Sequence, residues 1–230
     1  MGHHDGVTGF QASSAPSLTA VVAAEVRRIR DANPLGRITV IVPSFGASRD
    51  LVRALALSGG AVNVAVRTSS QVIAELSGPV LSPRAPLPFP LLAAAVDTAM
   101  DTDPGRLVDV ASEPVTGEAV ARACLRLGTI DPATVTPETP LHEEVLRLGA
   151  RAVSLTGPSY YTQFEAATVA LDRLNELGHV LVAAPLRGTR TEQRLRDSLE
   201  ERGVTVLPGT GADHLAGAAE PDTPEAVTGS

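Results

Sequence analysis

The sequence predicts an α/β fold in which helices cover both faces of a parallel sheet and a helical insertion interrupts the sheet. The clearest evidence is residues 37–42, which are β-branched and almost wholly apolar, as in a strand covered on both faces. Candidate strands and helices alternate through short connections, which implies that the strands are parallel. Between residues 91 and 177 only helical patterns occur, so an insertion explains the middle of the chain better than a second sheet.

The first part of the α/β domain is predicted over residues 1–77. Its strands span residues 7–10, 37–42 and 62–67, and its helices span residues 18–31, 44–57 and 68–77. Apolar residues recur at helical spacing in each helix. Ser44 or Ser48 is expected to cap the second helix, and Thr68 and the two serines after it the third.

Residues 78–177 are predicted to hold a proline-rich boundary and the helical insertion. Five prolines between residues 78 and 90 argue against regular structure there. The helices that follow are expected at residues 91–100, 117–127, 141–155 and 164–177. The chain then returns to the sheet over residues 178–208, with a strand at 180–184, a helix at 189–202 and a last strand at 204–207. Residues 209–230 are mostly small, acidic or proline and are predicted to be a disordered tail.

The chain contains no lysine, because all 19 of its basic residues are arginine. A Walker A loop needs the compact ammonium group of lysine at the β- and γ-phosphates, so ATP hydrolysis by that route is excluded. A nuclease site that places a lysine beside its metal-binding carboxylates is excluded for the same reason. The net charge of −7 also argues against independent affinity for nucleic acid.

The single cysteine, Cys124, precludes an intramolecular disulfide and is typical of a reducing cytoplasm. Its aliphatic neighbours predict a buried thiol rather than a reactive one. Because the sequence has neither a basic, apolar leader nor an apolar run that could span a bilayer, we expect a cytoplasmic protein without a membrane partner.

Several stretches resemble the N-terminal region of AddAB-type helicase/nuclease B subunits, a group that includes actinobacterial proteins of the PD-(D/E)XK nuclease family. These stretches span residues 33–44, 49–57, 62–67, 160–178, 180–185 and 192–199. The resemblance implies a degenerate, P-loop-like helicase motor domain with a helical insertion, in a DNA-repair enzyme that processes double-strand breaks. It also implies a partner motor subunit and DNA contact only in the complex.

Catalytic residues cannot be carried over from that family. The loop at residues 9–17 stands in the place of the phosphate loop but lacks its lysine and second glycine. The family's iron-sulfur cluster needs several cysteines, and this chain has only Cys124. We therefore predict no catalytic residue, no metal site and no cofactor. His142-Glu143-Glu144 lacks the second histidine of a zinc-binding helix, and its carboxylates favour the start of a helix electrostatically.

Four residues are candidates for contact with nucleic acid. Ser44 and Arg49 follow a strand at the carboxyl edge of the sheet, where open α/β folds bind ligands. Arg187 and Arg190 precede or begin a helix whose free N–H groups attract a phosphate. Each has a structural alternative: Ser44 as a helix cap, Arg49 as a solubilising residue, and the arginines as members of a solvated helix face that pairs with nearby carboxylates.

The alternatives for the aromatic pair Tyr160-Tyr161 are a stacking ring for a base and a helix start that packs on the insertion. The leading hypothesis for function is a non-catalytic, helicase-like domain with a structural and DNA-guiding role. The alternative is a small-molecule or nucleotide-binding α/β enzyme with its site near Ser44 and Thr68. A deep polar pocket there favours the alternative, whereas an arginine-lined groove or an exposed apolar face favours the subunit.

Overall fold

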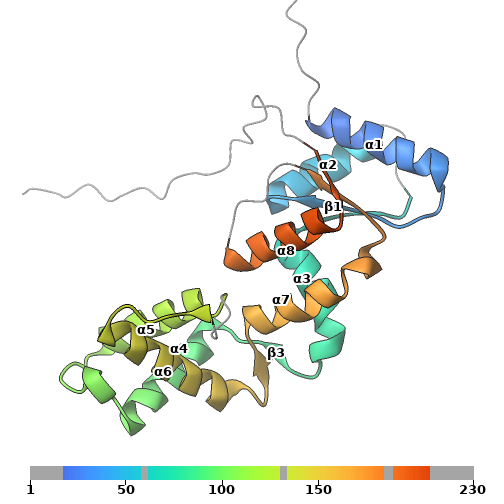
Figure 1. Ribbon diagram of the computed structural model, residues 1–230. Helices are drawn as coiled ribbons and strands as arrows, with labels where there is room; N and C mark the ends of the chain where they lie inside the picture. The colour runs from blue at the N-terminus through green and yellow to red at the C-terminus, as the bar shows by residue number, and fades with distance from the viewer. Residues whose placement is uncertain (1–17, 58–61, 130–133, 184–188, 208–230) are drawn as a thin grey trace, which may run out of the picture.

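The computed structural model describes residues 18–57, 62–129, 134–183 and 189–207. It has an α/β lobe and a helical lobe, and the chain passes from one to the other and back through two adjacent short segments (Figure 1). The predicted fold class is confirmed, because a parallel sheet has helices on both faces and a helical insertion follows its second strand. The predicted strand at 7–10 and the predicted tail at 209–230 lie outside the described residues.

The main sheet has four parallel strands in the order β2-β1-β5-β6. Their bounds are Ile38–Val42 for β1, Val64–Thr68 for β2, His179–Ala183 for β5 and Thr205–Leu207 for β6. All five residues of β1 are buried, as the apolar run predicts for a strand at the centre of the sheet. Its neighbours are in register, with Val40 opposite Val66 of β2 and Leu181 of β5.

Two helices cover one face of this sheet. They are α1 (Leu18–Ala32) and α2 (Phe45–Leu57). Because side chains alternate along a strand, Val40 and Val42 of β1 pack with these helices, whereas Ile41 faces the other way.

The opposite face is covered by α3 (Ser69–Leu81), α7 (Gln163–Asp172) and α8 (Arg190–Glu201). A short 3-10 helix at Leu174–Leu177 connects α7 to β5 through Gly178. Gly178 has a φ of 72°, and a Cβ there would lie 2.4 Å from the Arg37 carbonyl oxygen. The turn into β5 therefore requires glycine.

The helical lobe consists of α4 (Phe89–Thr102), α5 (Pro114–Leu127) and α6 (Pro140–Thr156), with a short 3-10 helix at Gly105–Leu107 after α4. Its core is separate from those of the sheet and is built from side chains such as Val96, Ala121 and Leu148. A two-stranded parallel ladder links the lobes, with β3 (Ala85–Pro86) beside β4 (Tyr160–Tyr161).

The proline-rich segment is more regular than its composition predicts. Helix α3 continues through Pro79 to Leu81, Pro86 lies in β3, and α4 includes Pro90 in its first turn. The expectation of irregular structure throughout residues 78–90 is therefore wrong. For Pro90 and Pro86 the reason is positional, because proline is tolerated in a first helical turn and on a strand edge.

The tyrosine pair precedes α7 and forms β4, so the interpretation as a helix start on the insertion is wrong. Tyr161 is buried in the core that α3, α7 and α8 share under the sheet. The predicted insertion at 78–177 thus contains α7, which packs on α3 and not within the helical lobe.

Candidate functional site

The carboxyl edge of the sheet has a switch point between its two central strands. Strand β1 leads into α2 on one face, and its neighbour β5 leads to α8 on the other. Open α/β sheets bind ligands at such points, because the loops diverge and leave a crevice. Ser44 follows β1 at this edge of the sheet, and Arg187 lies outside the described residues.

Ser44 is exposed and caps α2, since its Oγ accepts a hydrogen bond from the Ala47 backbone N–H at 3.2 Å. The helix cap foreseen as the structural alternative is therefore present. The next residue is Phe45, whose side chain is 64% exposed although its type is usually buried. Sequence reasoning missed it because the helical pattern alone does not show which face lacks a neighbour.

Arg49 lies one turn into α2, and its exposed neighbours form a continuous stripe. We call this stripe the α2 surface, and it consists of Phe45, Arg49, Val52 and Arg53. Val52 is 51% exposed. Neither arginine forms an ion pair with another residue in the described part of the chain. The α2 surface thus combines a ring, an aliphatic side chain and two unneutralised guanidinium groups.

Arg190 is the first residue of α8 and is exposed, on the opposite face of the sheet from α2. Thr189 caps this helix, and the Glu192 carboxylate accepts a hydrogen bond from the Thr189 N–H at 2.9 Å. This carboxylate lies where an anion would have to bind, so the helix start is already neutralised.

Farther along α8, the arginines have partners. Arg196 pairs with Asp197 at 3.0 Å and with Glu200 at 3.4 Å, as the interpretation of a solvated helix face predicts. Arg194 differs, because its guanidinium lies 4.8 Å from the centre of the Phe164 ring at the start of α7. That cation–π contact joins two helices far apart in sequence.

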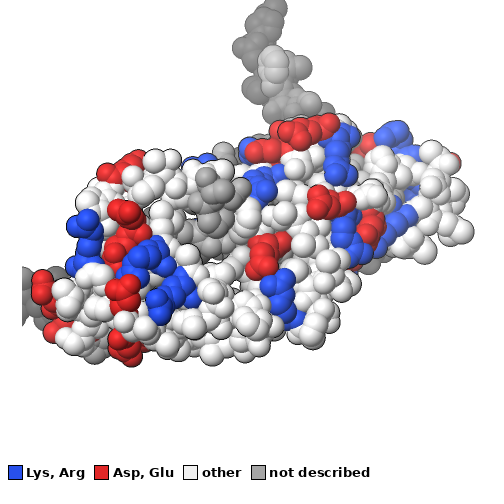
Figure 2. All heavy atoms as spheres, turned by 60° about the horizontal axis from the view of Figure 1, so that its bottom comes forward, with Lys and Arg blue, Asp and Glu red and all other residues white. Residues whose placement is uncertain are grey.

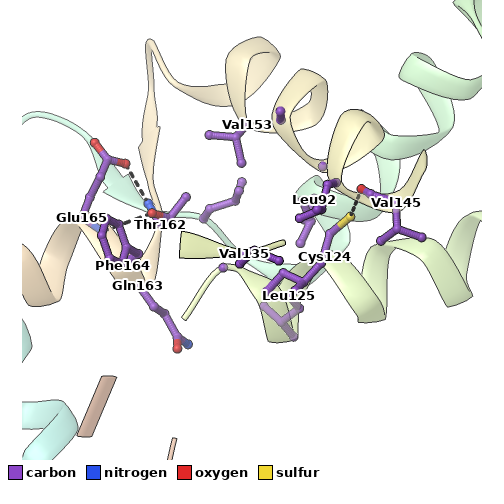
Figure 3. A pocket seen from close by; sticks show the side chains of 16 residues that line it. Leu92, Cys124, Leu125, Val135, Val145, Val153, Thr162, Gln163, Phe164 and Glu165 are labelled. Carbon is purple, nitrogen blue, oxygen red and sulfur yellow. Dashed lines mark hydrogen bonds between the residues drawn. The ribbon is translucent and has the colours of Figure 1, made fainter. Parts of the chain in front are cut away.

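A cavity of about 390 Å³ lies between α5, α6 and the start of α7 (Figure 3). We call it the α5–α6 cavity. Its walls are mostly aliphatic, and Thr162, Gln163 and Glu165 lie together at one end. Burial raises the pKa of the Cys124 thiol in its wall to about 11, so this sulfur is not a nucleophile at neutral pH. The prediction of a buried cysteine is confirmed.

A second cavity, of about 310 Å³, lies among α3, the two short strands, α7 and the first turn of α8. We call it the α3–α8 cavity. Polar side chains from three helices and β4 line it: Ser70, Ser77, Tyr161, Gln163, Thr191 and Glu192. Its first lining residue in the sequence, Ser70, lies two positions after Thr68, and Ser44 does not line it. The small-molecule alternative places its site near both Ser44 and Thr68, so the cavity agrees with it only in part.

Acidic and basic side chains are interspersed on the face in Figure 2, with broad uncharged areas between them. Many described arginines are paired, including Arg84 with Glu165 at 2.9 Å and Arg28 with Glu25 at 2.6 Å. Among the described residues, no group of His, Cys, Asp and Glu could hold a metal ion. Across those same residues, no helix is long and apolar enough to cross a bilayer.

No protein-family model matches the chain, and no curated protein matches it either.

Proposed function

We propose that this chain is a non-catalytic, helicase-like domain of a cytoplasmic DNA-repair helicase/nuclease, in which it has a structural and DNA-guiding role. The observation that carries the proposal is the α2 surface at the carboxyl edge of the sheet. Phe45 offers a face on which a base can stack, and Arg49 and Arg53 offer charge to backbone phosphates. The lack of lysine supports a role without ATP hydrolysis.

The acidity of the chain sets the strength of this contact. With a net charge of −7, the domain repels a polyanion at long range, so Arg49 and Arg53 give only weak binding on their own. A partner subunit that covers the α2 surface supplies the remaining affinity, and the exposed Phe45 and Val52 support a surface that another molecule covers.

The test is fluorescence anisotropy of a labelled single-stranded oligothymidine with the purified chain, at several salt concentrations. Replacing both Arg49 and Arg53 with alanine is expected to weaken binding roughly tenfold and to lower the slope of log K against log salt by about 1.4, as expected for two lost contacts to a single strand. Phe45→Ala weakens binding without changing the slope, because stacking releases no counterions.

Arg28→Ala is the matched control, because Arg28 is exposed but already paired with Glu25 on α1. Equal losses for Arg28→Ala and for the double variant would show that binding is non-specific and would overturn the role of the α2 surface. Magnesium-dependent ATP turnover by the pure chain would overturn the non-catalytic assignment.

The small-molecule alternative keeps one supporting observation, which is the α3–α8 cavity close to Thr68. Since that cavity lies on the face of α3 and α8, it is separate from the α2 surface on the other face. The two can therefore be tested independently.

A further inference from the structure

The wall of the α3–α8 cavity on the α3 side is a single helical stripe. Ser70, Ile73, Ala74 and Ser77 occupy positions i, i+3, i+4 and i+7 of the helix, and all four line the cavity. Side chains at this spacing share one face of a helix, so the serines at both ends of the stripe are directed toward the same space.

Ser77 is the feature that points to an occupant. The residue is fully buried, and its hydroxyl has no hydrogen-bond partner among the residues that the structure describes. Most buried hydroxyls in proteins are hydrogen-bonded, because an unsatisfied one forfeits its interaction with water. An alanine would fill this position without that cost. Because Ser77 is among the residues that line the cavity, a polar occupant is the partner that we assign to this hydroxyl.

Other polar groups in the wall suit a ligand that has several hydroxyl groups. The carboxamide of Gln163 offers both donors and an acceptor. The Thr191 hydroxyl donates to the Thr129 carbonyl oxygen at 3.2 Å, which leaves its own oxygen free to accept. Glu192 uses one carboxylate oxygen at the start of α8, and the other can accept from a ligand hydroxyl.

The remaining wall is apolar and includes Ile73, Pro86 and Leu87, with the ring of Tyr161 beside them. A molecule with hydroxyl groups on its edges and C–H groups on its faces matches this division. Glu192 is the one charged residue among the described residues of the wall, and no arginine joins it. An anionic ligand is therefore disfavoured. The volume of about 310 Å³ lies at the small end of the range for ligand sites.

We infer that the α3–α8 cavity binds a small, uncharged polyhydroxylated molecule of monosaccharide size, with Ser77 as one of its hydrogen-bonding partners. This site is independent of the α2 surface, so failure of one assignment leaves the other standing. The same hydroxyl chemistry is offered by a free sugar and by the ribose of a nucleoside, and the experiment distinguishes these sources.

The experiment is an NMR titration of the ¹⁵N-labelled full chain with D-ribose, D-glucose, uridine and ribose 5-phosphate. We expect saturable shifts of α3 and α8 backbone amides with millimolar affinity for at least one neutral probe. Binding of both uridine and D-ribose assigns the sugar ring as the recognised part, and D-glucose alone assigns a hexose. Ribose 5-phosphate is expected to bind more weakly than D-ribose, because its charge approaches Glu192.

Ser77→Ala is expected to weaken binding about fivefold through the loss of one hydrogen bond, while the unliganded protein keeps or raises its melting temperature. Ala74→Leu fills the cavity and is expected to abolish binding. Ser154→Ala, at an exposed position of α6, is the matched control and leaves binding unchanged.

Three results would overturn the inference. The first is the lack of saturable shifts with all neutral probes, and the second is equal binding by the wild type and Ala74→Leu. The third is a lower melting temperature of Ser77→Ala with unchanged affinity, since that outcome assigns the hydroxyl a purely structural role.

Discussion

The sheet lobe and the helical lobe bury their cores in different ways. Around the sheet, long aliphatic side chains of β1 and β5 are held between two layers of helices, and Ile41 and Leu181 are completely buried. In the helical lobe, three completely buried residues are alanines, at positions 99, 121 and 152. Both cores bury apolar area, and the buried alanines of the helical lobe allow its helices to approach closely.

Gly149 illustrates the second mode. A Cβ at this position of α6 would lie 2.9 Å from the Cys124 sulfur on α5, so these two helices approach as closely as their side chains permit. Cys124 and Gly149 also line the α5–α6 cavity, so this close contact forms part of the cavity wall (Figure 3). Both lobes nevertheless enclose a cavity, because the α3–α8 cavity lies among helices that cover the sheet.

The largest expected effect tests whether the two lobes are separate in stability. Leu181→Ala in β5 and Leu148→Ala in α6 each remove a completely buried leucine side chain. Each variant should lower the unfolding free energy of the lobe that contains it by about 2–5 kcal/mol. We expect Leu181→Ala to lower the urea midpoint of global unfolding, measured by circular dichroism. Leu148→Ala should instead reduce hydrogen-exchange protection in α4, α5 and α6.

Equal loss of protection in β1 and β5 for both variants would contradict this expectation. It would show that the lobes unfold as one cooperative unit, and the difference in packing would then have no thermodynamic counterpart.

An intermediate effect is expected from the pH dependence of the helical lobe. Burial raises the pKa of Cys124 from 9.0 to about 11, so the unfolded chain releases this proton at a lower pH than the folded chain does. Between these values the unfolded state binds fewer protons, and stability falls as pH rises, by about 2–3 kcal/mol once both states are ionised. The lack of lysine simplifies the measurement, because few other groups titrate in this range.

Urea unfolding across this alkaline range provides the measurement, with protection of α5 and α6 as the local readout. Cys124→Ala is the control and should remove most of the slope. A slope that persists unchanged in this variant would assign the alkaline loss to other groups.

The sequence predicts the main sheet better than the two-stranded ladder of β3 and β4 that links the lobes. The β-branched run 37–42 identifies β1, because only a strand covered on both faces is so uniformly apolar. Strands β3 and β4 have two residues each, too few to show an alternating pattern, and Pro86 and the tyrosines favour other interpretations. Local signals cannot reveal a pairing between residues 85 and 160, which depends on how the chain returns.

The same limit applies to the candidate sites. Local sequence rules predict that Ser44 caps a helix and that Arg196 pairs with a nearby carboxylate, and both predictions are confirmed. The α3–α8 cavity brings Ser70 close to Thr191, more than a hundred positions away, and no pattern links them. The exposure of Phe45 likewise depends on which helices cover the sheet, and this is a property of the whole fold.

The smallest expected effect concerns a hydrogen bond that links the two lobes. The buried Thr191 hydroxyl of α8 donates to the Thr129 carbonyl oxygen beyond α5, at 3.2 Å. Thr191→Val keeps the shape but leaves that carbonyl without this donor, so we expect a cost of about 1 kcal/mol in urea unfolding and faster exchange at the end of α5. Thr168→Val is the matched control, since its hydroxyl bonds the Phe164 carbonyl oxygen within its own exposed helical turn. Equal effects of the two variants would show that the hydrogen bond from Thr191 to Thr129 does not hold the lobes together.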